Sequence, residues 1–353
     1  MKRCISDEIA EVLRKELNGC RYRIGETLPS VDALRKRFAA GEYAVRRAIR
    51  KLHDEGLVSV TKHVGAVVTE KSAFKWKGHV AFVHTSTCCS YFMQRIALQL
   101  SRRFEAAGRT MHMVFLDANA DGSIDVSPLM RHVSAGLDFA VVISEFRQVA
   151  SVFDRAAVPY VVLNGFAREF PNARAVVKEE SAGCYAALIR AMKERGMKTI
   201  LEIDYDRRMD RSFKSQLADA GMTVWRELCK FDNETVHSLS DVKMLGHSVV
   251  ARYLSSRSNR DHLPDVVLFD DDYLAAGGVV AILEAGLRIP DDIGIVTFSN
   301  RGNELVADKP FARIEIDPVS YGDAVAKYVL ALLEGRRVAP PRVKMRFIPG
   351  ESL

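Results

Sequence analysis

The sequence predicts an α/β protein in which a small basic module, mostly helical, precedes a large body of two doubly wound parallel sheets. The first observation is charge: residues 1–77 hold 17 Lys and Arg against 10 Asp and Glu, whereas the rest of the chain holds 34 against 35. The second observation is the spacing of the apolar residues. Apolar residues recur every three or four positions in residues 6–56, but from Gly78 onward short apolar runs alternate with longer helical segments. A cationic module on a nearly neutral body indicates that the module meets a polyanion.

The composition excludes several classes of protein. Of the 353 residues, 48% are hydrophobic and 27% are charged, which is typical of a folded chain rather than a disordered one. No run of 18 apolar residues occurs, and residues 1–10 lack the apolar stretch of a signal peptide, so we expect a cytoplasmic protein with no membrane partner. The six cysteines have neither CxxC spacing nor the density of a disulfide scaffold, so we expect reduced thiols, no metal site and no cofactor.

Three helices and a hairpin are predicted in the first module. Residues 6–17 carry one apolar stripe and form the first helix. Ser30 is a good N-cap for a second helix over residues 31–39, and a short turn leads to a third in EYAVRRAIRKLHDEG, which Gly56 ends. The β-branched runs LVSV and GAVVTE then predict a two-stranded hairpin. This order predicts a winged helix-turn-helix over residues 1–69 that binds double-stranded DNA, with its third helix in the major groove.

The runs LPSVDALRKRF, VRRAIRKLHDEGLVSV and GAVV resemble the DNA-binding domain of the GntR family of bacterial repressors, at the spacing of that family. The chain departs from the family at the start of the third helix, where Gly41-Glu42 replaces Ser-Arg, and at the wing, where His63-Val64-Gly65 replaces Gly-Arg-Gly. An acid at position 42 would repel phosphate. Each basic residue could instead be a solvated surface cation. The expected DNA contacts are Arg35, Arg37, Tyr43, Arg46, Arg47, Arg50 and Lys62.

The body alternates predicted strands and helices in two similar halves. Its strands are HVAFVHT, MHMVFL, DFAVVIS, PYVVLN, TILEID, a segment near VWREL, DVVLFDD and GIVTFS. The tail IEIDPVSYGDAVAKYVLALLEG adds a strand and a long helix, and VKMRFIPGE adds a last strand. We expect residues 70–77 to be a linker. The body, residues 78–353, is expected to comprise two subdomains, residues 78–164 with 293–317 and residues 165–292 with 318–353.

The residues that follow the apolar runs are mostly polar, and ligands of open parallel sheets bind at those carboxyl ends. The run LPDVVLFDDDYLAAGGVVAILEAGLRIPDDIGIVTFSN resembles the effector domain of the LacI family, which has the type I periplasmic-binding-protein-like fold, and Asp272 aligns with the ligand-binding aspartate of that family. Together with the GntR-like module, the resemblance is to regulators of the arabinose-repressor type. The expected contacts to a small polar, sugar-like effector are Tyr91, Phe92, Ser144, Asn164, Arg208, Asp272 and Asn300.

The effector site also departs from the LacI pattern. Met209 stands where that family has an arginine, Ser299 where it has an aspartate, and Lys178 with Glu179 where it has another aspartate. A standard pentose or hexose pose is therefore not implied, and the pattern is also compatible with a repressor that has lost its effector.

An enzyme, or a sugar-binding protein without a DNA role, is compatible with the layout of the body as well, because doubly wound folds host both. The sequence contains no GxxxxGK[ST], no GxGxxG after a strand, no GxSxG and no HExxH, so no catalytic residue is assigned and we do not expect an enzyme. The sequence predicts instead a bacterial, homodimeric, ligand-responsive transcriptional repressor that binds a palindromic operator.

Overall fold

The computed structural model divides the chain into two compact units, Met1–Gly78 and His79–Leu353. It describes residues 4–18, 21–61, 64–69, 78–85, 90–116, 119, 123–143, 147–205, 211–229, 238–256, 263–305 and 307–353. None of the helices in these ranges combines the length and the hydrophobicity that a bilayer span needs.

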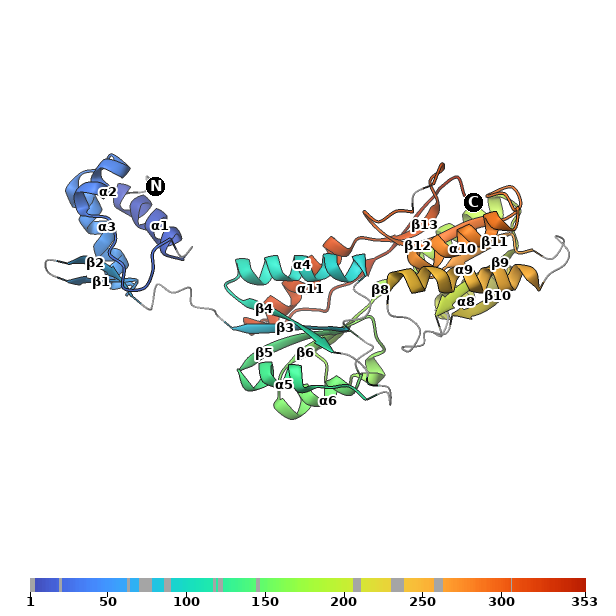
Figure 1. Ribbon diagram of the computed structural model, residues 1–353, viewed down its shortest axis with the longest axis horizontal. Coiled ribbons are helices and arrows are strands. Elements are labelled where there is room, and N and C mark those ends of the chain that lie inside the picture. Colours follow the sequence, from blue (N-terminus) through green and yellow to red (C-terminus); the bar gives the residue numbers. More distant parts are fainter. Residues whose placement is uncertain are drawn as a thin grey trace. The chain divides into compact units, whose positions relative to one another are not determined.

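The first unit is a winged helix-turn-helix, as predicted (Figure 1). Ser30 caps the second helix, because its hydroxyl accepts a hydrogen bond from the backbone N–H of Ala33. Gly56 follows the third helix with a φ of 74°, a left-handed conformation that glycine adopts without strain. The two strands pair antiparallel from Val58↔Val68 to Thr61↔Gly65. The elements are α1 (Ile5–Asn18), α2 (Val31–Phe38), α3 (Glu42–Asp54), β1 (Val58–Thr61) and β2 (Gly65–Val68).

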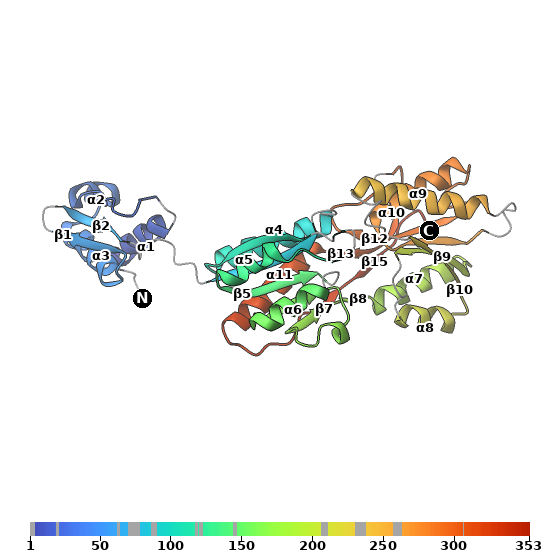
Figure 2. The same ribbon diagram turned by 60° about the horizontal axis from the view of Figure 1, so that its bottom comes forward.

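The second unit contains two lobes, and the first lobe has a five-stranded parallel sheet in the order β4-β3-β5-β6-β7. Helices α4 and α11 cover one face of this sheet, and α5 and α6 cover the other (Figures 1 and 2). Its strands are β3 (His79–Thr85), β4 (Thr110–Leu116), β5 (Leu137–Ile143), β6 (Tyr160–Leu163) and β7 (Ala175–Val177). Its helices are α4 (Tyr91–Ala106), α5 (Ser127–Ser134), α6 (Arg147–Ala156), η2 (Ala167–Glu169) and α11 (Pro318–Leu333).

The second lobe has a six-stranded sheet in the order β10-β9-β11-β12-β13-β15, in which only β15 runs antiparallel. Buried residues of α7 and α8 pack on one face, and those of α9 and α10 pack on the other. Its strands are β9 (Thr199–Tyr205), β10 (Thr223–Cys229), β11 (Val266–Phe269), β12 (Gly294–Asn300), β13 (Ala312–Ile316) and β15 (Arg346–Ile348). Its helices are α7 (Ala182–Glu194), α8 (Arg211–Asp219), α9 (Leu239–Ser255) and α10 (Asp272–Glu284).

Three segments of the chain connect the lobes. One contains β8 (Glu179–Glu180), and a second contains β14 (Val343–Lys344), which pairs parallel with β8. The third is the short step from β13 to α11, where the Asp317 carboxylate caps the helix by accepting hydrogen bonds from the backbone N–H groups of Val319 and Ser320. Two lobes joined by three adjacent segments can rotate about those segments as a hinge.

The predicted division of the body into subdomains is wrong in two places. Strands β12 and β13 lie in the second lobe, because β12 pairs with β11 in the register Val266↔Gly294 and β13 continues the same sheet. Helix α11 lies in the first lobe, because its buried residues Tyr321, Val325 and Val329 share a core with α4 and β3. Residues 293–317 and 318–333 are therefore exchanged relative to the prediction. The predicted last strand is also divided into β14 and β15.

Candidate functional site

Helix α3 presents a basic face. Tyr43, Arg46, Arg47 and Arg50 have the spacing i, i+3, i+4, i+7, which places them on one side of the helix, and all four are exposed. The Tyr43 side chain is 79% accessible. The opposite side packs into the core of the unit through Val45, Ala48, Ile49 and Leu52. We call Tyr43, Arg46, Arg47 and Arg50 the α3 stripe. The buried side of α3 holds the helix against the core, and the three arginines of the α3 stripe therefore point outward.

Glu42, the predicted source of repulsion, is paired with two arginines. Its Oε1 accepts a hydrogen bond from Arg46 Nε at 2.7 Å, and its Oε2 lies 3.9 Å from Arg35 Nη1. The negative charge is thereby compensated within the protein, and both arginines lose part of their capacity for phosphate. Arg47 and Arg50 form no ion pair with any residue in the described part of the chain.

Arg37, also a predicted DNA contact, joins α2 to α1. Its guanidinium donates to both carboxylate oxygens of Glu16, one at 2.9 Å, and lies 4.8 Å from the ring centroid of Phe38. The hydrogen bond from Arg37 holds the pKa of Glu16 below its ordinary value. This bidentate pair indicates a structural role for Arg37. Lys62 lies outside the described residues.

Tyr91, the first residue of α4, makes contacts across the two lobes. Its backbone N–H donates to the hydroxyl of Tyr273 at 3.1 Å, and its own hydroxyl donates to the backbone carbonyl of Arg301 at 3.4 Å. Gly302 has a φ of 88°, and a Cβ at this position would lie 2.5 Å from the Tyr91 hydroxyl oxygen. Tyr91 follows the carboxyl end of β3, whereas Tyr273 and Arg301 follow those of β11 and β12. The carboxyl edges of the two sheets therefore face each other.

Asp272 is the most deeply buried acid at this junction, with 2% of the residue accessible. Its Oδ2 accepts hydrogen bonds from the side-chain amides of Asn300 at 3.1 Å and Asn303 at 2.9 Å. Its Oδ1 is buried and has no hydrogen-bond partner in the structure. Burial raises the pKa of the Asp272 carboxyl, and the two amides oppose that rise. An unpaired buried carboxylate oxygen of this kind is ready to accept a hydrogen bond from a ligand hydroxyl.

The neighbouring acid, Asp271, has a different role. Its carboxylate is the N-cap of α10 and accepts hydrogen bonds from the backbone N–H groups of Tyr273 at 2.7 Å and Leu274 at 3.2 Å. Asp271 therefore stabilises the start of the helix. Asp272, in contrast, accepts a hydrogen bond from the side chain of Asn300.

Of the remaining predicted effector contacts, Phe92 packs edge-on against Tyr321, with ring centroids 5.5 Å apart, and joins the core of the first lobe. This packing indicates that Phe92 supports the fold rather than a ligand. Asn164 is exposed, with a φ of 59°, and its backbone N–H donates to the carbonyl of Val177 at 2.9 Å. Ser144 and Arg208 lie outside the described residues.

Sequence reasoning missed Asn303, Tyr273 and Arg226. A second asparagine three residues after Asn300 was a visible signal, whereas the cross-lobe contact of Tyr273 depends on tertiary structure. Arg226 on β10 donates to Glu202 Oε2 at 2.6 Å and to Asp204 Oδ2, which places two buried acids of β9 around one guanidinium. Burial raises the pKa of Glu202. The charges of this network pair with one another, so we assign it a structural role at the edge of the sheet.

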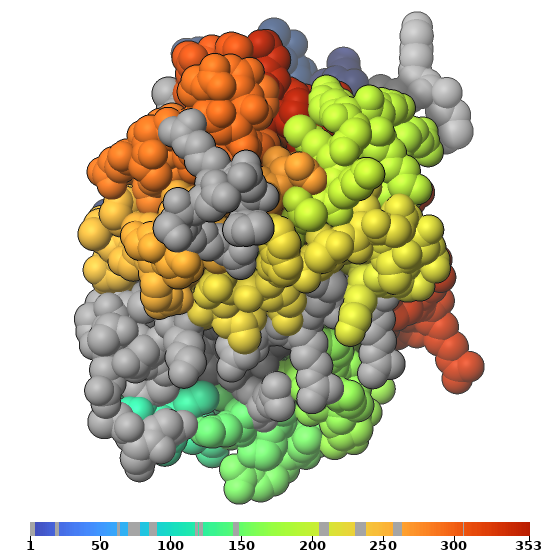
Figure 3. All heavy atoms as spheres, turned by 90° about the vertical axis from the view of Figure 1, so that its right-hand side faces the viewer, coloured from blue at the N-terminus to red at the C-terminus, as the bar shows by residue number. Residues whose placement is uncertain are grey.

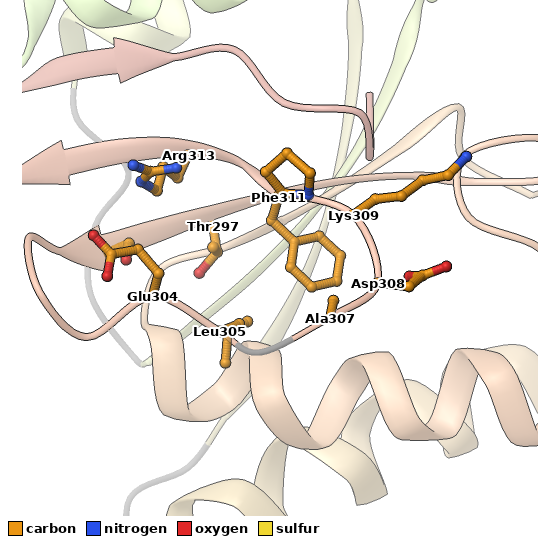
Figure 4. Close-up of a pocket in the computed structure, with 10 residues that line it drawn as sticks. Thr297, Glu304, Leu305, Ala307, Asp308, Lys309, Phe311 and Arg313 are labelled. Atoms are coloured by element: carbon orange, nitrogen blue, oxygen red, sulfur yellow. The ribbon is translucent and has the colours of Figure 1, made fainter.

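A separate pocket of about 330 Å³ lies in the second lobe. Figure 4 shows the ring of Phe311 in its centre, with Arg313 and Glu304 on one side and Asp308 and Lys309 on the other. Asp272 does not line it. Among the described residues, no group of three or more His, Cys, Asp or Glu side chains is arranged to hold a metal ion.

Two protein-family models match different parts of the chain. The family described as bacterial regulatory proteins, gntR family, matches residues 5–68, and the family described as periplasmic binding protein-like domain matches residues 189–353. The HTH-type transcriptional repressor MelR of Bacillus subtilis is 29% identical over 85 residues, which are 24% of this chain and 25% of that repressor. The chain thus aligns with about a quarter of the length of this curated relative.

Several solved structures with a similar fold are transcriptional regulators. A LacI family regulator from Enterococcus faecium with bound ribose has a TM-score of 0.62 at 16% identity, and the alignment covers 78% of this chain and 98% of that one. The lac repressor dimer bound to operator and an anti-inducer has a TM-score of 0.62 at 15% identity, over 79% of this chain and 94% of that one. At these identities the likeness concerns the fold. The chain therefore combines a segment that matches the gntR family with one that matches the periplasmic binding protein-like domain, and its second unit has the fold of LacI family regulators.

Proposed function

We propose that the protein is a transcriptional repressor that binds double-stranded DNA through the α3 stripe and responds to a small polar effector held between its lobes. The observation that carries the proposal is the division of α3 into a buried apolar side and an exposed side with Tyr43 and three arginines. Arginines on an exposed recognition helix supply phosphate and base contacts. This role makes the protein a cytoplasmic regulator rather than an enzyme.

The effector is held at the facing carboxyl edges of the two sheets. Asp272 supplies a carboxylate for hydroxyl groups, Asn300 and Asn303 orient that carboxylate, and Tyr91 connects the lobes beside it. A ligand that binds both lobes more tightly in one arrangement shifts the population toward that arrangement. The ribose bound to the Enterococcus faecium regulator supports a sugar-like effector.

The protein acts as a homodimer in this proposal. The outer side of α9 and α10 carries the exposed apolar residues Met244, Val280 and Leu283, with accessible fractions of 62%, 46% and 55%. Figure 3 views the second lobe from the right-hand side of Figure 1, and α9 and α10 belong to the amber and orange part of that surface. Exposed apolar residues gathered on two adjacent helices suit a partner surface. Two copies related by a two-fold axis would present two readers to the half-sites of a palindrome.

The double variant Arg47→Ala, Arg50→Ala tests the DNA-binding role. Because these two cations are exposed and unpaired in the described structure, their loss removes phosphate contacts without opening the core. We expect the affinity for a mixed-sequence 30-base-pair duplex to fall about tenfold or more at moderate salt, measured by fluorescence anisotropy. The matched control is Arg155→Ala, an exposed arginine of α6, which should leave the affinity unchanged. Equal affinity of the double variant and the wild type would remove the α3 stripe from the DNA interface.

A further inference from the structure

The first lobe holds two cations beside one exposed aromatic ring. The Nζ of Lys178 lies 4.4 Å from the ring centroid of Phe166, and the guanidinium carbon of Arg168 lies 5.3 Å from the same centroid. Phe166 is 47% accessible. The ring attracts each cation weakly, by about 0.5–1 kcal/mol at an exposed site. We call Phe166, Arg168 and Lys178 the basic-aromatic cluster.

The two cations of this cluster have no carboxylate partner among the described residues. Lys178 and Arg168 are both exposed, and both are next to acids in the chain. Glu180, two positions after Lys178, pairs instead with Arg342 at 3.4 Å. Arg226 in the second lobe, by contrast, is paired with Glu202. Two cations gathered without a counter-charge form a site that favours an anion.

The basic-aromatic cluster lies on the edge of the first sheet that faces the second lobe. Phe166 follows the carboxyl end of β6, and Lys178 follows that of β7, whereas Tyr91 follows that of β3 on the same edge. Because β5 alone separates β3 from β6, the carboxyl ends of β3 and β6 are two strand spacings apart, about 10 Å. Tyr91 in turn contacts Tyr273, the residue after Asp272. The cluster and Tyr91 therefore lie along the same edge of the first sheet, and Tyr91 contacts the residue next to Asp272.

Lys178 also immediately precedes β8, one of the three segments that connect the lobes. An anion bound to Lys178 therefore contacts the hinge itself. This position couples binding to the angle between the lobes, because differential contact in the two arrangements is what shifts their equilibrium.

From these placements we propose that the effector is a polyhydroxylated anion, in which hydroxyl groups donate to Asp272 and a carboxylate or phosphate group binds Lys178 and Arg168 beside Phe166. This inference rests on the proposed effector site and adds the charge class of its ligand. A neutral sugar would leave the two cations without a partner. The anionic group binds the basic-aromatic cluster and not Asp272, since the carboxylate of Asp272 repels an anion placed directly against it.

The test compares acids with their neutral parents in thermal unfolding of the full chain. The probes are gluconate, glucose 6-phosphate and ribose 5-phosphate, their neutral parents glucose and ribose, and inorganic phosphate against chloride at equal ionic strength. The wild type should gain about 3 °C or more in Tm with at least one sugar acid or sugar phosphate and a smaller gain with inorganic phosphate. Gluconate and the two phosphates distinguish a carboxylate from a phosphate site.

The double variant Lys178→Gln, Arg168→Gln should lose these gains, and its Tm without ligand should fall by no more than about a few degrees, because both side chains are exposed and lose only the weak contacts with the Phe166 ring. Lys193→Gln on α7 is the matched control and should keep them. The inference is overturned if none of the anions raises Tm, if a neutral sugar raises it as much as its acid, or if the gain persists in the double variant. A neutral sugar that binds and changes DNA affinity would leave the proposed function standing. Anion binding in a protein that does not bind DNA would overturn the proposed function and leave the anion site standing.

Discussion

At the scale of single residues, the same residue types serve structural and functional roles, and their partners distinguish the two. Arg37 is bound to Glu16 on α1, whereas Arg47 and Arg50 have no acidic partner in the described structure. Asp271 caps a helix, whereas its neighbour Asp272 keeps one buried oxygen unpaired. Sequence alone placed Arg37 among the DNA contacts together with Arg47 and Arg50, because a partner 21 positions away does not appear in a local pattern.

Glu42→Ser is expected to strengthen DNA binding. The change removes a negative charge at the start of α3 and frees Arg46, now hydrogen-bonded to that carboxylate at 2.7 Å, and Arg35 for phosphate. It also provides a hydroxyl in the first turn of the helix. We expect a gain of about threefold to tenfold in affinity for duplex DNA, measured by anisotropy at fixed salt. A decrease in affinity would mean that Glu42 contacts a base or orients Arg46 for one.

Asp272→Asn is expected to stabilise the protein near neutral pH while weakening effector binding. Burial raises the pKa of this carboxyl, so the folded state favours the neutral form, and the contribution of Asp272 to stability falls as pH rises from the ordinary pKa through the raised one. The asparagine variant does not lose stability in this way, because its amide does not ionise. Urea unfolding at pH 4 and pH 7 should show the variant gaining about 1 kcal/mol relative to the wild type at the higher pH. A relative loss at pH 7 would show that the charged form is stabilised in the fold.

At the scale of elements, periodicity predicted nearly every helix and strand, but it did not predict which sheet each strand joins or which sheet each helix covers. The sequence patterns of α3 and α10 are strong because one side is buried and a capping residue precedes or follows the helix. The membership of β12, β13 and α11 could not be read in the same way. An apolar run predicts a buried strand but not the sheet in which it is buried, and the exchange of β13 and α11 between lobes depends on long-range pairing.

Three histidines connect β3, β4 and α5 at the start of the second unit. His79 Nδ1 lies 3.2 Å from His112 Nε2, and the rings of His112 and His132 have centroids 4.9 Å apart. Burial, followed by the charges of His132 and His79, lowers the pKa of His112 below 6.5. A histidine whose pKa is lowered in the folded state contributes stability that is fully present above its unfolded-state pKa of about 6.5. That stability is lost as pH falls from there through the lowered pKa of the folded state.

His112→Gln should therefore reduce the acid sensitivity of the protein. We expect the wild type to lose roughly 1 kcal/mol or less more than the variant between pH 7.5 and pH 5, measured by urea unfolding at both pH values. Above pH 7 the difference between the free energies of unfolding of the two proteins should be constant. Parallel losses throughout the acid range would show that the pKa of His112 is the same in the folded and unfolded states.

At the scale of the whole molecule, a cationic reader is joined to a two-lobed receptor whose hinge carries the proposed anion-binding residue Lys178. The charge division visible in the sequence, 17 cations against 10 acids in the first 77 residues, agrees with the α3 stripe. The two family matches fall on the reader and on the receptor separately. The proposed DNA contacts all lie in the first unit, so DNA binding can be measured without knowing the effector.

The salt dependence of DNA binding by the full chain tests the central claim most directly. We expect the affinity for a duplex to fall about a hundredfold between 50 and 200 mM KCl, because each phosphate contact of the two readers in a dimer releases a counterion. A linear plot of log affinity against log salt, with a negative slope that becomes shallower in the Arg47→Ala, Arg50→Ala variant, is the predicted result. Affinity that does not change with salt, or no binding at any salt concentration, would contradict the account.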